Sequence, residues 1–229
     1  CGRDAAGRHR PAMTPIDFWF DPVSPYAYLA FERLPEAFVG LSYTVAYRPI
    51  VFAALLKHYA HKGPAEIEPK RAWTFRHVGW QAHRHRVALH PPAQHPFNPL
   101  SLLRLALACA PQGRTPSRHV CEQLFRHVWC GGGDANDAGR LAALTAQLAP
   151  ARDPSSDEVK QALKDATANA IAGGVFGVPT IALDGRLFWG VDALEMVAAC
   201  LRGDPWFDGP AWDAAAAAPP GVQRKGAKT

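Results

Sequence analysis

The chain has no long uninterrupted hydrophobic run, although 48% of its 229 residues are apolar. No segment approaches the roughly 20 consecutive apolar residues that a membrane-spanning helix needs. The first residues, CGRDAAGRHRPAM, also lack the apolar stretch of a secretory signal. A lipoprotein remnant would begin with a cysteine such as Cys1, but no lipid-attachment context accompanies it. We therefore expect a cytoplasmic protein with no membrane partner, whose natural start lies near Met13.

Cysteine is scarce, and no two cysteines form a Cys-x-x-Cys pair. The five cysteines are an odd number and lie far apart, which disfavours both a disulfide framework and a cysteine-rich zinc site. The ten histidines show no His-Glu-x-x-His or similar ligand spacing. We therefore expect free thiols, no metal site, and histidines that are solvated or hydrogen-bonded. The cysteines are Cys1, Cys109, Cys121, Cys130 and Cys200.

The central part of the chain has no excess of positive charge, although the formal net charge is +5. Residues 1–12 hold three arginines against one aspartate, and residues 221–229 hold three basic residues and no acidic one. Residues 13–220 are therefore formally neutral. Because non-specific phosphate binding needs a basic face on the folded part, we expect no nucleic-acid partner.

Two short β-prone segments flank a segment with helical spacing. The run IDFWF, residues 16–20, predicts a strand, and an Asp-Pro turn signal follows it. Apolar residues at helical spacing predict a helix over residues 26–39. The segment LSYTVAYR, residues 41–48, predicts a second strand that ends before Pro49. This succession is typical of a βαβ unit, in which a crossover helix joins parallel strands.

Residues 50–150 have helical spacing almost throughout and few clusters of β-branched residues. Within this block, Trp73, Phe75 and Trp80 alternate with arginines, a mixture that also occurs on nucleic-acid-binding surfaces. Helical spacing favours another interpretation, in which the aromatic residues lie in the core and the arginines are solvated. A few of these arginines would then add positive potential to a site for anionic ligands.

The last third of the chain returns to an alternating pattern. A helix is expected over residues 156–171, and TIALDGRLFWG predicts two short strands around the Asp184-Gly185 turn. A final helix is expected over residues 192–201, and periodicity is lost after about residue 205.

This order of elements predicts an α/β protein with a thioredoxin-like fold and an inserted all-helical domain, although other α/β folds share parts of the pattern. The thioredoxin-like domain is expected to be discontinuous. The expected units are a flexible N-terminal extension (1–12), the thioredoxin-like domain (13–50 and 156–204), the helical insertion (51–155) and a flexible C-terminal tail (205–229).

Three motifs occur in the order FDPVSPYAYLA, PFNPLSLLRLALA and GVFGVPTIALDGRLFWGVDAL. Together they resemble the 2-hydroxychromene-2-carboxylate isomerase family, over about residues 16–201. This family is close to the kappa-class glutathione transferases, within a wider group of bacterial disulfide oxidoreductases that carry a helical insertion. The resemblance implies a glutathione-dependent cytoplasmic enzyme of aromatic degradation, commonly a homodimer.

The residues SPYA, 24–27, stand where a redox enzyme of this fold carries Cys-x-x-Cys, so dithiol exchange at this position is excluded. Taken alone, Ser24 followed by Pro25 is a good helix N-cap and first-turn pair. The resemblance implies instead that the Ser24 hydroxyl donates a hydrogen bond to the sulfur of glutathione. A helix N-terminus also favours a thiolate. Because the two roles use the hydroxyl in opposite directions, we expect the cap to be left to backbone groups.

Two further segments are implied to hold glutathione. The resemblance predicts a cis Val178–Pro179 bond that faces the helix at Ser24, with the Val178 backbone contacting the cysteinyl part. It also implies that Asp192 and the backbone of Val191 receive the γ-glutamyl end. The competing interpretation of Asp192 is a helix-capping box with Glu195.

Three more residues are candidates for the substrate pocket. Lys57 would meet a carboxylate of glutathione or substrate, or else be simply solvated. His61 stands where relatives often carry asparagine, which leaves the substrate contacts of this loop open. Asn98 matches a family position near the pocket, but a turn residue would look the same.

These observations predict a glutathione-dependent cis–trans isomerase that acts on aromatic carboxylates resembling 2-hydroxychromene-2-carboxylate. Two alternatives stay open. A kappa-class-like transferase or peroxidase would use the same glutathione site, and a non-catalytic protein of this fold would bind glutathione without turnover.

Overall fold

A computed structural model describes residues 13–219 and residue 221. Its centre is a four-stranded sheet in the order β2-β1-β3-β4. β1 (Thr14–Phe20) pairs in parallel with β2 (Tyr43–Pro49), and it pairs antiparallel with β3 (Thr180–Leu183). β4 (Arg186–Trp189) is antiparallel to β3, as the Asp184-Gly185 turn predicts. The parallel pair is joined by α1 (Pro25–Ala37), so the expected βαβ unit is present.

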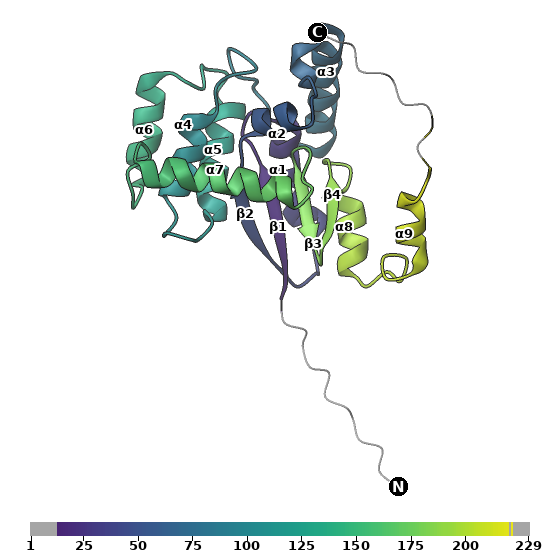
Figure 1. Ribbon diagram of the computed structural model, residues 1–229. Coiled ribbons are helices and arrows are strands. Elements are labelled where there is room, and N and C mark those ends of the chain that lie inside the picture. Colours follow the sequence, from purple (N-terminus) through teal and green to yellow (C-terminus); the bar gives the residue numbers. More distant parts are fainter. Residues whose placement is uncertain (1–12, 220, 222–229) are drawn as a thin grey trace.

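Helices cover both faces of the sheet (Figure 1). Successive side chains of β1 point to opposite faces. Phe18 and Phe20 belong to the large core cluster that includes α1, whereas Trp19 packs with Ala170 of α7 and Val178. In Figure 1, α4, α5 and α6 lie beyond β2, and α8 lies beside β4. The remaining helices are α2 (Phe52–His58), η1 (Pro64–Glu66), α3 (Glu68–His85), α4 (Leu100–Ala108), α5 (Arg118–Trp129), α6 (Ala138–Leu148), α7 (Asp157–Ala172), α8 (Leu194–Leu201) and α9 (Pro210–Ala216).

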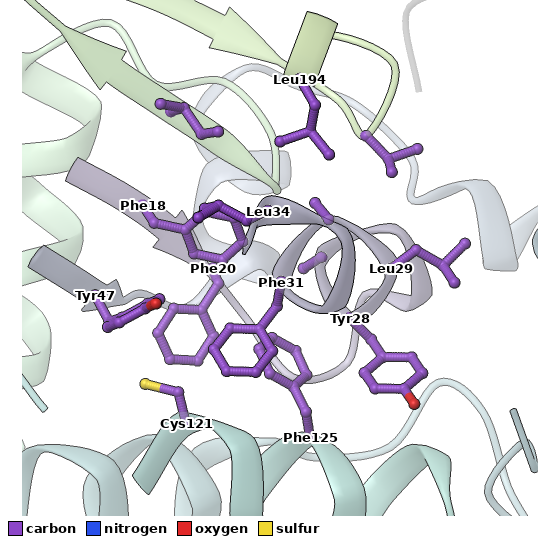
Figure 2. Packing of buried hydrophobic residues seen from close by; sticks show 14 of the residues in the cluster. Phe18, Phe20, Tyr28, Leu29, Phe31, Leu34, Tyr47, Cys121, Phe125 and Leu194 are labelled. Atoms are coloured by element: carbon purple, nitrogen blue, oxygen red, sulfur yellow. The ribbon is translucent and has the colours of Figure 1, made fainter. Parts of the chain in front are cut away.

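The insertion shares one aromatic core with the sheet (Figure 2). Phe125 of α5 lies between Phe20 of β1 and Phe31 of α1, with ring centroids 5.3 and 5.0 Å away. All three side chains are fully buried, and each such burial is worth roughly 1.5–3 kcal/mol. The helical insertion therefore packs on the thioredoxin-like part through a continuous core.

The C-terminal segment differs from the expected flexible tail, because part of it is folded. α9 lies within this segment, and Phe207 is buried. The Trp212 ring of α9 lies 5.6 Å from the rings of both Phe188 and Phe207. The sequence did not predict this folded part, because the residues after about 205 lack apolar periodicity and include a run of alanines beside the aromatic residues. The expected extension over residues 1–12 and the last residues of the tail, 222–229, lie outside the described residues.

The prediction that the aromatic residues of α3 lie in the core is wrong for two of them. Trp73 is 65% exposed and Trp80 is 52% exposed, while Phe75 is half-buried. The helix instead buries Val78 and Ala82, which share one face at i, i+4 spacing. Bulky side chains therefore remain outside on the other faces of α3. Among the described helices, none is both long and apolar enough to cross a membrane.

Candidate functional site

Ser24 lies at the N-terminus of α1 and is 7% exposed. Its Oγ accepts a hydrogen bond from the Ala27 N–H at 3.2 Å and donates one to the Val178 carbonyl at 3.3 Å. The expectation that the cap is left to backbone groups is therefore wrong. A hydroxyl has one proton and two lone pairs, so capping occupies a lone pair and leaves the proton for another acceptor.

The Val178–Pro179 peptide bond is cis, as predicted, and the bond from Ser24 shows that it faces the start of α1. Val178 is buried, and the Pro179 carbonyl accepts the Gly190 N–H at 2.9 Å. This bond brings the end of β4 alongside the cis bond. The backbone around Val178 thus lies between α1 and the turn that leads into α8.

Asp192 does not cap α8, which begins at Leu194 with Ala193 as its N-cap and no side-chain capping bond. The capping-box interpretation is therefore wrong, because the helix begins two residues later than expected. The Asp192 side chain is exposed, whereas the Val191 side chain is buried in the core. Gly190 has φ +100°, and a Cβ there would collide with the Asp192 carboxylate, so this turn requires glycine.

The three candidate substrate residues are all exposed. Lys57 lies in the last turn of α2, and His61 follows that helix. The Asn98 side-chain oxygen accepts the Leu100 N–H at 3.1 Å, the hydrogen bond expected of a turn residue. Within residues 13–219, no hydrogen bond joins any of these three side chains to Ser24.

Asp21, which in the sequence is only part of an Asp-Pro turn signal, is a fully buried carboxyl three residues before Ser24. Its two oxygens accept the Val23 N–H at 3.0 Å and the Phe52 N–H at 2.9 Å. Burial raises the pKa of Asp21 from 3.8 to about 7, although both N–H bonds oppose the rise. Asp21 thereby ties the loop before Ser24 to the first residue of α2.

Two residues of the helical insertion also hold this loop. The Trp129 Nε1–H donates to the Pro22 carbonyl at 2.9 Å, and His95 Nε2 lies 2.8 Å from the Val23 carbonyl. Because a carbonyl only accepts, His95 must carry its hydrogen on Nε2. Burial lowers the pKa of His95, which keeps the ring neutral near pH 7. No sequence motif pointed to either residue.

At the N-terminus of α1, Pro25 has no N–H and the Ala27 N–H is bonded to Ser24 Oγ, so the Tyr26 N–H and the positive end of the helix dipole remain. Both favour an anion such as a thiolate. Ser24 and Ala27 leave no cysteine pair for dithiol exchange.

In the part of the chain that the structure describes, no cluster of three or more His, Cys, Asp or Glu side chains could hold a metal ion. Cys109, Cys121, Cys130 and Cys200 are free, as predicted, and Cys1 lies outside the described residues.

The sheet order, the cis proline opposite α1 and the helical insertion define a thioredoxin-like protein of the DsbA type. A family model described as the DSBA-like thioredoxin domain matches residues 15–202, and the chain belongs to this family.

Relatives and a solved structure agree with the sequence motifs. The 2-hydroxychromene-2-carboxylate isomerase of Sphingobium xenophagum is 25% identical over 189 residues, which cover 80% of this chain and 95% of that protein. Glutathione S-transferase kappa 1 of Rattus norvegicus is 24% identical over 213 residues, which cover 86% and 94%. A solved structure of 2-hydroxychromene-2-carboxylate isomerase has a TM-score of 0.72 at 22% identity, covering 85% of this chain and 97% of that one. The predicted fold and resemblance are therefore confirmed.

Proposed function

We propose that this protein is a glutathione-dependent isomerase of unsaturated aromatic carboxylates such as 2-hydroxychromene-2-carboxylate. The observation that carries the proposal is the Ser24 hydroxyl at the N-terminus of α1, opposite the cis Val178–Pro179 bond. Similarity to proteins named 2-hydroxychromene-2-carboxylate isomerase and glutathione S-transferase kappa 1 supports the substrate class and the cofactor.

The residues at this position fit glutathione. The tripeptide offers a thiol, a backbone-like cysteinyl unit and a charged γ-glutamyl end. The start of α1, the backbone at Val178 and the exposed carboxylate of Asp192 match these three parts in turn. When bound, glutathione would supply a thiolate that adds to an electrophilic carbon, so that a double bond becomes a rotatable single bond before the thiolate leaves.

Ser24 would stabilise and orient the sulfur rather than act as nucleophile itself. Its proton now points to the Val178 carbonyl and would turn to the sulfur, while its lone pair keeps the Ala27 N–H. Asp192 would accept hydrogen bonds from the ammonium group of the γ-glutamyl end. Fixing the cysteinyl and γ-glutamyl parts of the tripeptide would place its thiol at one position relative to the substrate, which removes much of the entropic cost of reaction.

The decisive assay incubates the purified protein with 2-hydroxychromene-2-carboxylate, with and without glutathione, and monitors the ring-opened isomer. Glutathione-dependent formation of this isomer, lost on its omission, is the expected result. Calorimetric binding of glutathione is measured in parallel. Binding without any isomer formation would contradict the isomerase and leave a binding protein.

A kappa-like transferase is the second candidate, because glutathione S-transferase kappa 1 is similar over 86% of this chain. It would use the same glutathione site but release a stable conjugate. Mass analysis of the products distinguishes the two, since an isomerase returns glutathione unchanged.

A further inference from the structure

Tyr26 lies in the first turn of α1, two residues after Ser24, and is half-buried. Its phenol oxygen is 2.9 Å from Nδ1 of His77 on α3. The Asp192 carboxylate is close enough for its charge to act on this phenol. Tyr26 is therefore close to Ser24 and within reach of the charge of Asp192, the residues proposed to hold the thiol and the γ-glutamyl end of glutathione.

The contacts of His77 determine which way the bond to Tyr26 runs. Its Nε2 is 3.3 Å from the side-chain nitrogen of Gln81, one turn further along α3. An amide nitrogen only donates, so Nε2 accepts and carries no hydrogen. A neutral imidazole then has its hydrogen on Nδ1, where it donates to the Tyr26 oxygen. The proton of the Tyr26 hydroxyl is left free for another acceptor.

The His77 ring stacks with the rings of two tryptophans of α3, one before it and one after it in the sequence. The His77 ring lies nearly parallel to Trp73, with centroids 6.1 Å apart and planes at 7°. It is also nearly parallel to Trp80, at 6.4 Å and 14°. These contacts restrain the plane of the His77 ring, and its bonds to Tyr26 and Gln81 set which edge faces Tyr26.

The Tyr26 hydroxyl keeps its proton near neutral pH. Burial is the largest influence and raises the pKa of Tyr26, and the charge of Asp192 raises it further. The Thr74 side chain opposes this rise. The hydrogen donated by His77 occupies a lone pair of the Tyr26 oxygen and leaves the phenol proton available.

We propose that Tyr26 is a catalytic hydrogen-bond donor that stabilises the carbonyl oxygen of the substrate. The inference rests on the proposed function. When a nucleophile adds to the conjugated carbon, one carbon–sulfur bond forms and the π electron pair moves onto the carbonyl oxygen. When the nucleophile leaves, the electron pair returns and the carbon–carbon double bond re-forms. Tyr26 donates a hydrogen bond to the charged oxygen throughout and loses no proton.

The first test is independent of activity. Nitrogen-15 NMR of the ligand-free protein at about pH 8.5, two units above the ordinary histidine pKa, identifies the neutral tautomer of His77. A hydrogen on Nδ1 is expected. A hydrogen on Nε2 would mean that Tyr26 donates to His77, and it would overturn the inference.

The second test compares Tyr26→Phe with Ser24→Ala. Loss of one donor to a developing oxyanion should lower kcat of Tyr26→Phe on the order of 10²-fold. Its calorimetric affinity for glutathione and the ultraviolet titration of the bound thiolate should match wild type, whereas Ser24→Ala should shift that titration. Unchanged kcat in Tyr26→Phe would overturn the inference alone, because active wild-type protein leaves the isomerase proposal standing. An inactive wild type would overturn the proposed function and the inference together.

Gln81 supplies a matched pair of variants that leave Tyr26 in place. Gln81→Glu accepts a hydrogen from Nε2, which reverses the tautomer and turns the Tyr26 proton toward His77. Its kcat at about pH 8.5 should fall toward that of Tyr26→Phe. For Gln81→Met, whose thioether is only a weak acceptor, log kcat should fall by less than half as much. Equal rates for both Gln81 variants would contradict the role assigned to the His77 tautomer.

Discussion

Replacement of Asp21 by asparagine should reveal a buried carboxyl that resists ionisation. An unfolded aspartate loses its proton near pH 3.8, whereas burial in the native state raises this pKa to about 7. Between these values only the unfolded state releases the proton, so rising pH favours unfolding by about 1.36 kcal/mol per pH unit. The stabilising contribution of a protonated Asp21 is therefore complete below pH 3.8, and about 4 kcal/mol is lost by pH 8.

The assay is urea unfolding of wild type and Asp21→Asn at a series of pH values from about 4 to 8. Asparagine does not titrate, so the difference between the two unfolding free energies isolates Asp21 from every other group. The advantage of wild type should shrink as the pH rises. Asp157→Asn, which removes a carboxylate that is 99% exposed, controls for the loss of a surface charge. A wild-type advantage that stays constant over this range would show that the two backbone N–H bonds outweigh burial, and it would refute the reasoning.

Three other substitutions and one titration of the wild-type protein have defined outcomes. Ser24→Ala should cost about 1 kcal/mol of stability through the lost cap, measured by urea unfolding, and should raise the pKa of bound glutathione, measured by ultraviolet titration. Asp192→Ala should weaken calorimetric glutathione binding by roughly 1.5–3 kcal/mol without lowering the melting temperature, because α8 begins at Leu194. Since burial lowers the pKa of His95, wild type should lose stability relative to His95→Gln as the pH falls below about 6.5. Thiol titration of denatured, unreduced protein should find every cysteine free; a shortfall in fresh protein would contradict this.

The fold could be predicted from sequence because its signals are local. Strand β1, the helix start at Ser24 and the Asp184-Gly185 hairpin each follow from a few adjacent residues. The predictions failed where contacts between residues far apart in the sequence determine which side chains are buried. Trp73 has the spacing of a core residue, yet α3 buries Val78 and Ala82. The folded segment around α9 depends on contact with Phe188 of β4, which no window of sequence displays.

The residues of the candidate site also divide into those that sequence motifs predicted and those that they did not. Motifs identified Ser24, Val178 and Pro179, and the structure brings these residues together. Motifs did not identify His77 or His95, because each acts through one contact with a residue more than 50 positions away. A histidine pattern in the sequence carries no information about which carbonyl or phenol it will meet. The expectation that Ser24 would leave the cap to backbone groups was wrong for a chemical reason. One hydroxyl can accept the capping hydrogen bond and donate its own proton at the same time.

The loop from Asp21 to Ser24 connects the two parts of the protein at the point where chemistry is expected. Its carbonyls at Pro22 and Val23 are held by Trp129 and His95 of the insertion. Its carboxyl is held by backbone of the same loop and of α2. A thioredoxin-like domain alone would leave those two carbonyls to water, and the Ser24 hydroxyl would follow the motion of the loop. Because stabilisation of a thiolate depends on a donor fixed in position before reaction, the insertion contributes to the site by holding this loop rather than by supplying the donor.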